Sequence, residues 1–540
     1  MNTMTPGEVD YSVINLSSKW KILRQQWRFA VWSMWISIGS FMLGFDYVAG
    51  GQLAALSVFK RQFGVQGPDG SWFIPARYLS AWNAIGPVFE FLSAILAAPF
   101  LERYGRRPMI FVSVLFTTVG VLMQQLSREW TLHLGGRAVN GFAIGIMFTI
   151  CPLYLGENSR PELRGFMLCF FNTSIVIGQF LIVLVSRGSE TLNNIWQWET
   201  VIVVQYIWPL LLIVGVWWFP ESPYWLIREG HSDKARQALR KLYGNQNPDS
   251  FFDIEMDRLT TDVRVTQELT GSFETKTVLG FPLPTAEMEC FKGKNFKRTF
   301  TAIWAASAQQ MIGATFVIAY ATYFFDLIGF KNYFDASVVL YVCMVLSTCA
   351  AFYFVEVAGR RTLLVWPGFI LTLLLLIIGI AGSVPNKKAG SWAIIVFTYL
   401  WAIIYQLSIG ATGFVLASEV ATMRLRAATQ SLVTATNAVW GLIMQFTIPY
   451  MINPDAGNLG GKTGYIFAGL GLVASIGGYY LYPETKGISF ERIDQLYLAG
   501  VPPRHFSKDT HREDFDLSVE ELATEGKRKM DVEAVEVTKQ

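Results

Sequence analysis

Residues Leu363–Ala381 read LLVWPGFILTLLLLIIGIA and include no side chain with a formal charge. At 1.5 Å per residue, a helix of this length can cross a hydrocarbon core about 30 Å thick. A second uncharged stretch, Ala393–Ile409, follows closely along the chain. One such run could be the buried helix of a large soluble protein. The chain contains about twelve of them, which indicates a membrane protein that crosses the bilayer repeatedly.

Apolar windows place the membrane spans and leave two stretches outside the membrane. The predicted spans lie near residues 29–51, 78–100, 108–126, 132–155, 165–186, 196–219, 300–328, 334–355, 362–384, 391–417, 428–452 and 464–482. Residues 220–298 are charged and polar, with a short helical pattern at Lys234–Leu242. Residues after about 498 are rich in Asp, Glu, Lys and Thr, a composition typical of a disordered tail. The predicted class is an all-α membrane protein with twelve transmembrane helices.

Composition agrees with this class and excludes several others. Of the 540 residues, 52% are hydrophobic and 16% are charged, whereas soluble domains have about 25% charged residues. A net charge of +3 is too small to indicate nucleic-acid binding. The five cysteines show no paired spacing, so neither a disulfide framework nor a metal site is predicted. The first 28 residues contain no apolar core of a signal peptide.

Lysine and arginine are enriched on one side of the predicted membrane. That side carries Lys19, Lys21, Arg24, Arg28, Arg103, Arg106, Arg107, Arg160, Arg164, Arg360, Arg361, Arg424 and Arg426. The opposite side carries Lys60, Arg61, Arg77, Lys387 and Lys388. Because basic loops stay in the cytoplasm, the first side is expected to be cytoplasmic, together with both termini.

Three motifs of the first half of the chain recur in the second half, in the same order and at nearly one offset. Glu102–Arg107 (ERYGRR) recurs as Glu356–Arg361 (EVAGRR). The other two pairs are Glu157 with Arg164, matched by Glu419 with Arg426, and Pro220–Pro223 (PESP), loosely matched by Pro483–Lys486 (PETK). The repeat predicts two parallel six-helix halves with the substrate between them near the midplane. The expected regions are an N-terminal tail at 1–28, the halves at 29–219 and 299–482, a helical loop at 220–298 and a C-terminal tail at 483–540.

Taken together, these motifs resemble those of the sugar porter family of the major facilitator superfamily. The resemblance covers residues 29–500 and rests on Leu101–Arg107, Gly136-Arg137, Pro152–Glu157 with Arg164-Gly165, Phe219–Leu226, Gln309-Gln310 with Gly313, and Pro483–Gly487. Within the family the chain looks most like the fungal α-glucoside (maltose-type) permeases, through Gly313–Phe316, Tyr320–Phe325, Pro449–Pro454 and Gly461–Gly464. The resemblance implies the major facilitator fold.

Charged residues inside predicted spans are candidates for proton coupling, because charge in a membrane is costly and usually functional. Asp46 lies about 17 residues into the first span, and Arg137 lies near the start of the fourth, which runs in the opposite direction. The two therefore share a depth and can pair. The resemblance implies that such a pair is a protonation switch, and that Glu90 near the bilayer centre is a second proton carrier. The alternatives are a static salt bridge and a glutamate bonded to neighbouring helices.

Neutral hydrogen-bonding side chains and aromatic rings are the expected lining of a sugar site, because hydroxyl groups need both donors and acceptors. The positions that match the family's binding residues are Asn172, Gln179, Gln309, Gln310, Thr315, Tyr320, Gln406, Phe414 and Asn437. For the polar residues the alternative role is a hydrogen bond between helices. For Phe414 and Tyr320 the alternative is packing.

The repeated charged motifs resemble the family's salt-bridge networks, which form a cytoplasmic gate. The implied residues are Arg106, Glu157, Arg164, Arg360, Glu419 and Arg426. The alternative is that these are solvated charges at loop ends.

The predicted function is a secondary active transporter that imports a sugar, an α-glucoside or a hexose, by proton symport and alternating access. It is expected at a fungal plasma membrane, as a monomer. The alternatives are an uncoupled sugar facilitator, a carrier of another polyol-like substrate, and a sugar sensor that does not transport. No nucleophile–base pair or ligand cluster indicates an enzyme or a metal site. Gly469–Ala474 fits a dinucleotide-binding fingerprint but lies in a predicted membrane helix, where small residues serve close packing. Ala456–Thr463 misses a P-loop because Ala456 replaces the first glycine, so no nucleotide or other cofactor is expected.

Overall fold

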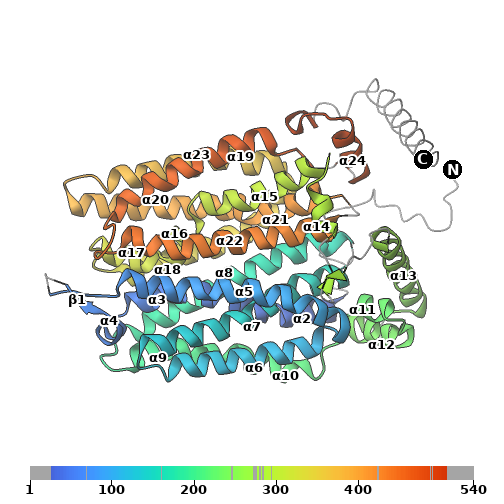
Figure 1. Ribbon diagram of the computed structural model, residues 1–540, viewed down its shortest axis with the longest axis horizontal. Coiled ribbons are helices and arrows are strands. Elements are labelled where there is room, and N and C mark those ends of the chain that lie inside the picture. The colour runs from blue at the N-terminus through green and yellow to red at the C-terminus, as the bar shows by residue number, and fades with distance from the viewer. Residues whose placement is uncertain are drawn as a thin grey trace. The chain divides into compact units, whose positions relative to one another are not determined.

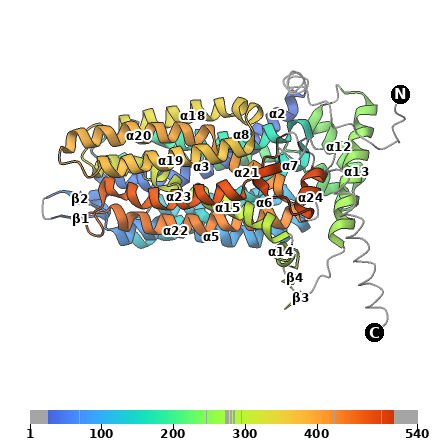
Figure 2. The same cartoon turned by 90° about the horizontal axis from the view of Figure 1, so that it is seen from above.

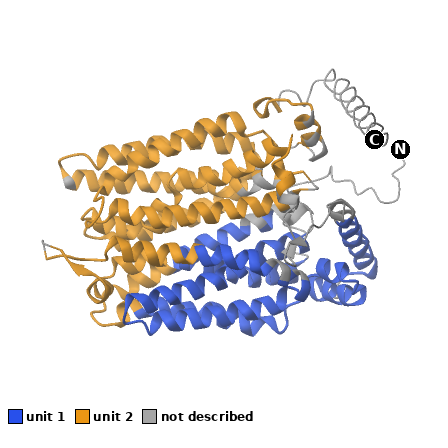
Figure 3. Ribbon diagram, in the orientation of Figure 1, with its two compact units in different colours: residues 1–47, 88–181, 199–268 blue, residues 48–87, 182–198, 269–540 orange. Residues whose placement is uncertain are grey.

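The computed structural model describes residues 26–67, 70–159, 161–244, 247–271, 277–278, 281–282, 285–293, 295–422, 425–486, 488 and 490–506. Contacts divide the chain into two compact units (Figure 3). Unit 1 comprises residues 1–47, 88–181 and 199–268, and unit 2 comprises residues 48–87, 182–198 and 269–540. Within the described residues, twelve helical segments are long and apolar enough to cross a membrane. The predicted all-α membrane class is therefore confirmed.

Unit 1 is built from helices alone within the described residues. Its elements are α2 (Trp27–Ile36), the first part of α3 (Ile38–Ala55), the second part of α5 (Ala76–Tyr104), α6 (Arg106–Gln125), α7 (Trp130–Asn158), most of α8 (Pro161–Ser189), most of α9 (Trp196–Val203), η1 (Val204–Tyr206), α10 (Ile207–Val216), α11 (Pro223–Arg228), α12 (Ser232–Tyr243) and most of α13 (Asp249–Gly271). Figures 1 and 2 show α11, α12 and α13 beyond one end of α6 and α7. The predicted pattern at Lys234–Leu242 thus corresponds to α12, whereas α13 was not predicted.

Unit 2 contains the remaining elements. They are α4 (Ser57–Phe63), β1 (Val65–Gln66), β2 (Trp72–Phe73), β3 (Thr277–Val278), β4 (Phe281–Pro282), α14 (Thr285–Cys290), α15 (Asn295–Met311), α16 (Ala314–Ala319), α17 (Ala321–Leu327), α18 (Tyr333–Val357), α19 (Arg360–Ala381), α20 (Lys387–Leu407), α21 (Ile409–Val420), α22 (Arg426–Ile452), η2 (Gly460–Lys462), α23 (Thr463–Leu481), α24 (Phe490–Leu498) and η3 (Pro503–His505). The strands form two short antiparallel pairs, β1 with β2 and β3 with β4. Helix α19 packs against α20 and α23. Of the tail predicted after about 498, residues 507–540 lie outside the described part.

Two predicted spans contain a residue whose backbone leaves the helical conformation. The span predicted at 300–328 consists of α15, α16 and α17, and Gly313 between the first two has φ +83°. Only glycine adopts this left-handed conformation without strain, so the helix can change direction there. The span predicted at 391–417 is interrupted at Ser408, where φ is −125° and ψ is −93°. A break in a membrane helix frees backbone groups from the regular helical bonding, and other parts of the protein or a cavity must then satisfy them.

Candidate functional site

A buried ion pair joins α3 to α7 inside unit 1. Arg137 Nη1 donates to Asp46 Oδ1 over 3.0 Å, and the two residues are only 4% and 8% exposed. The pairing expected from their shared depth is therefore present. Asn140 Nδ2 donates to the same carboxylate oxygen over 2.9 Å. Sequence reasoning missed Asn140, although its position three residues after Arg137 places both side chains on one helix face.

Glu90 differs from Asp46 in having no partner of this kind. It lies half-buried on α5 within unit 1. Its carboxylate makes no hydrogen bond or ion pair with any described residue. The interhelical bonding considered as its alternative role is thus not found in the described part of the chain.

The polar residues around the break at Gly313 bond to one another or to the backbone in unit 2. Gln309 Nε2 donates to the carbonyl of Ile409 over 3.1 Å. The Thr315 hydroxyl, which is fully buried, donates to Gln310 Oε1 over 2.6 Å. Gln309 therefore links α15 to α21, while Gln310 is half-buried and is held by Thr315 across the break.

The hydroxyl of Tyr320 has two polypeptide partners, both in unit 2. It donates to the carbonyl of Gln445 over 3.0 Å and accepts a hydrogen bond from Asn83 Nδ2 over 2.7 Å. The carbonyl of Gln445 needs this donor, because the residue four positions later is Pro449, which has no N–H. Tyr320 is fully buried, so these contacts favour a structural role over the predicted sugar contact.

Tyr320→Phe is accordingly expected to lower stability more than sugar affinity. The change leaves buried polar groups of Asn83 and Gln445 without a partner, at a cost of about 1–3 kcal/mol for each. Thermal unfolding of the purified variant should show a lower melting temperature, while the apparent KM for sugar should change by less than about threefold. An unchanged melting temperature with a strongly raised KM would instead restore the sugar-contact role.

Several predicted sugar-site residues have polar atoms without a partner in the described part of the structure. On α8 in unit 1 they are Asn172 Nδ2 and Gln179 Oε1, and on α22 in unit 2 it is Asn437 Nδ2. Buried polar atoms almost always have a partner, so these amides fit ligand hydroxyls or water. Gln406 is buried at the end of α20, and the side chain of Phe414 lies outside the described part.

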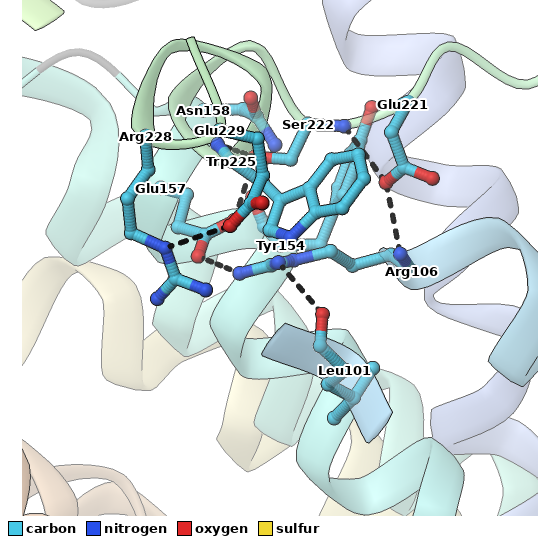
Figure 4. Close-up of polar contacts among 10 residues, drawn as sticks. All are labelled: Leu101, Arg106, Tyr154, Glu157, Asn158, Glu221, Ser222, Trp225, Arg228 and Glu229. Carbon is cyan, nitrogen blue, oxygen red and sulfur yellow. Dashed lines mark hydrogen bonds and ion pairs between the residues drawn. The ribbon is translucent and has the colours of Figure 1, made fainter. Parts of the chain in front are cut away.

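Figure 4 shows the first of the two repeated charged clusters, in unit 1. Arg106 pairs with Glu157, and its Nη1 donates to the carbonyl of Leu101 over 3.3 Å. Glu157 also accepts from the Ser222 hydroxyl over 2.6 Å. Glu221 accepts from the backbone N–H groups of Arg106 and Arg107, over 2.9 and 3.1 Å. The carboxylate of Glu221 therefore caps the N-terminus of α6, where negative charge is stabilised.

Gly105 makes room for this cap. Its φ is +86°, and a Cβ at this position would lie 2.8 Å from Glu221 Oε2. A residue other than glycine would therefore be strained and would displace the carboxylate. The Arg107 side chain contacts the end of α10, where it donates to the carbonyls of Val216 and Trp217 over 3.0 and 3.1 Å. The motif at 102–107 thus joins the ends of four transmembrane segments.

The second cluster repeats these contacts within unit 2. Arg360 binds both oxygens of Glu419, over 3.1 and 3.3 Å. The Thr485 hydroxyl donates to Glu419 over 2.5 Å, and Glu484 accepts from the backbone N–H of Arg360 over 2.9 Å. The side chains of Arg164 and Arg426 lie outside the described part. Each cluster is therefore closed by residues of its own unit, as far as the structure describes it.

The recurrence of Pro-Glu-Ser as Pro-Glu-Thr was visible in the sequence, but the role of its residues was not predicted. In each copy the acid caps a helix and the hydroxyl binds the glutamate of the ion pair. Their matching spacing to the other two motifs was the available signal. The two clusters are ordered networks rather than solvated charges at loop ends.

Unit 2 also joins segments from the two sequence halves. Gln52 Nε2 donates to the Thr322 hydroxyl over 2.6 Å, and Lys60 pairs with Asp326. A further contact is an ion pair between Arg187 Nε and Asp335 Oδ1 at 2.5 Å. Within unit 2, Asp335 lies in the first turn of α18, whereas the second charged cluster begins at Arg360, just after the other end of this helix. None of these contacts was predicted from the sequence.

With this geometry described, comparison with known proteins identifies the family. The model of the family described as "Sugar (and other) transporter" matches residues 32–497. The chain belongs to this family of transporters. Its repeated clusters and its buried ion pair therefore lie in a multi-pass membrane protein of the major facilitator superfamily.

The curated relatives of this sugar transporter include glucose and hexose transporters of two yeasts. The low-affinity glucose transporter HXT1 of Saccharomyces cerevisiae is 27% identical over 481 residues, which are 87% of this chain and 81% of the relative. Hexose transporter 2 of Kluyveromyces lactis is 25% identical over 481 residues, covering 87% and 82% of the two chains. The narrower resemblance to α-glucoside permeases is not repeated among these relatives.

Solved structures confirm the fold. The xylose transporter XylE from E. coli, in a partially occluded inward-open conformation, has a TM-score of 0.68 at 17% identity, covering 85% of this chain and 99% of XylE. XylE, described as a proton:xylose symporter, bound to 6-bromo-6-deoxy-D-glucose has a TM-score of 0.67 at 17% identity, covering 87% and 99%. The predicted major facilitator fold is thus correct.

Proposed function

We propose that this sugar transporter carries a hexose into the cell together with a proton, by alternating access. The observation that carries the proposal is the buried ion pair between Asp46 and Arg137 inside the predicted membrane region. A carboxylate there is costly, and a proton can replace the guanidinium as the group that neutralises it. The unpartnered amides of Asn172, Gln179 and Asn437 supply donors and acceptors for sugar hydroxyls.

A hexose is favoured over an α-glucoside because the relatives named above are glucose and hexose transporters. The proton is favoured because Asp46 is buried beside its only charged hydrogen-bonding partner among the described residues. We place both termini and the two charged clusters on the cytoplasmic side of a plasma membrane, in agreement with the distribution of lysine and arginine. The contacts of Gln52 and Lys60 then belong to the outer side.

Transport assays in a cell that lacks its own sugar carriers test this proposal. Uptake of labelled glucose, xylose, maltose and a polyol is measured with and without a protonophore. Accumulation of a hexose that the protonophore abolishes supports symport. Uptake that only equilibrates identifies an uncoupled facilitator. Absence of all uptake, with the protein at the cell surface, would identify a sensor.

The glutamine pair of α15 provides a prediction about recognition. Adjacent residues on a helix point about 100° apart, and Gln309 is already bonded to Ile409. Gln310→Ala is therefore expected to raise the apparent KM for hexose about threefold to thirtyfold, the cost of one neutral hydrogen bond or of a stranded hydroxyl. Saturation kinetics measure the change. The matched control is Thr447→Val, because within the described part of the chain the Thr447 hydroxyl bonds to its own helix alone. Equal KM values in the wild type and both variants would remove Gln310 from the site.

A further inference from the structure

Asn140 and Arg137 donate hydrogen bonds to the same oxygen of Asp46. Both side chains donate to Asp46 Oδ1, over 2.9 and 3.0 Å respectively. The second carboxylate oxygen, Oδ2, takes no part in these two bonds. A proton can therefore bind to the carboxylate without first displacing Asn140.

The backbone of α7 is held tightly at Asn140. The residue is 1% exposed, and α6 approaches it at Gly120, where a Cβ would lie 2.6 Å from the Asn140 backbone nitrogen. The side chain is thus confined to the interior of unit 1. Because a carboxylate only accepts hydrogen bonds, the amide presents its NH₂ group to Asp46. Its own oxygen, Oδ1, is buried and has no partner in the described part of the structure.

The charged groups around Asp46 come from two helices. Arg137 acts from α7, and the carboxyl of Glu90 on α5 interacts electrostatically with Asp46. His133, one turn before Arg137 on α7, interacts with Arg137. Other neighbours of α3 in unit 1 present uncharged groups: Thr117 of α6 bonds to Met42, Ile175 of α8 packs on Gly44, and Trp208 of α10 packs on Phe41 and Phe45. Asn140 is thus the neutral polar partner of the carboxylate.

We propose that Asn140 is a positioning residue that holds Asp46 in both of its protonation states. Toward the carboxylate it is a hydrogen-bond donor, as observed. When a proton from the outside water forms an O–H bond on Asp46, the ion pair with Arg137 is lost. Rotation of the amide by about 180° then brings Oδ1, which lacks a partner, to accept from that O–H. Asp46 stays oriented until the proton is released to the inside water. This inference rests on the proposed proton-coupled function.

The test uses the full-length protein in liposomes of egg phosphatidylcholine with labelled D-glucose. Two activities are compared: accumulation driven by an inside-alkaline pH gradient, and exchange at equal pH on both sides. Asn140→Leu has a similar volume but neither donates nor accepts. Asn140→Ser keeps a hydrogen-bond donor and an acceptor, but on a shorter side chain. Thr149→Val is the control, since the one bond of the Thr149 hydroxyl to a described residue is to Gly145 of the same helix.

Asn140→Leu is expected to move the external pH of half-maximal uptake upward by about one unit, or about 1.4 kcal/mol. The sign follows because the amide bonds the charged carboxylate more strongly than the neutral acid, so its loss favours the protonated form. Accumulation should fall about tenfold or more, because release inside is impaired, while exchange at acid pH is kept. Asn140→Ser should lie between Asn140→Leu and the wild type, and Thr149→Val should match the wild type.

Failure of this inference can be told apart from failure of the proposed function. Wild-type protein that does not accumulate glucose under the gradient overturns proton coupling, and the role of Asn140 with it. Wild-type accumulation with an unchanged pH profile in Asn140→Leu overturns the role of Asn140 alone. If Asn140→Leu does not fold, Asn140→Asp is measured in its place. A second carboxylate beside Asp46 should also raise the external pH of half-maximal uptake. An unchanged pH of half-maximal uptake would reject the inference.

Discussion

Asp46→Asn is expected to abolish accumulation of hexose against its gradient while leaving exchange partly intact. Asparagine keeps the size of the side chain but cannot take up a proton at neutral pH, so sugar movement is no longer linked to the proton gradient. The assay is the ratio of internal to external labelled glucose under an imposed pH gradient. In the wild type the ratio rises above one, and in the variant it should settle at about one, the value for simple equilibration.

A stability control is needed because Asp46→Asn also leaves Arg137 buried without its counter-charge. Removing one partner of a buried ion pair costs about 3–5 kcal/mol. The double variant Asp46→Asn with Arg137→Gln removes both charges and should regain much of this stability without regaining accumulation. Full accumulation by Asp46→Asn at acidic external pH would contradict the assignment. Attention would then move to Glu90, whose carboxylate has no hydrogen-bonded or ion-pair partner in the described structure.

Glu157→Gln is expected to destabilise the protein strongly and to impair uptake at normal membrane levels. Arg106 and Glu157 are 4% and 9% exposed in their side chains, so Arg106 would be left buried and uncompensated at a cost of about 3–5 kcal/mol. The equivalent pair Arg360 and Glu419 is 19% exposed on each side. Glu419→Gln should therefore have the smaller effect. Thermal unfolding and initial uptake rates of the two variants measure the difference.

An exposed ion pair serves as the control for this comparison. Arg236 and Asp253 lie 2.8 Å apart with side chains 41% and 57% exposed. Asp253→Asn should cost less than about 1 kcal/mol, because water and salt screen exposed charges. If Glu157→Gln, Glu419→Gln and Asp253→Asn all retained wild-type stability and kinetics, the two clusters would have no more importance than surface charge.

Hydropathy located all twelve membrane segments, because the length of an apolar run is set by the thickness of the bilayer. Gly313 is a local signal for the break between α15 and α16, because only glycine adopts this backbone conformation without strain. The interruption at Ser408 has no such signal at that residue and was not predicted. The helix α13 was also missed, because its polar, soluble-type pattern lacks the strong apolar stretch that identified the membrane segments.

The sequence alone determined that the chain crosses a membrane twelve times, that its halves are related, and that Asp46 and Arg137 can meet. These properties depend on the length of apolar runs, on repeated motifs and on position along a helix, all of which follow from the order of residues in the chain. The tertiary structure decided which groups satisfy one another. Asn140 on the carboxylate, Glu221 and Glu484 at helix N-termini, and Tyr320 at the carbonyl freed by Pro449 are such partners. Hydrogen bonds act over about 3 Å between residues far apart in the chain, so only the packing of the helices determines which of them form.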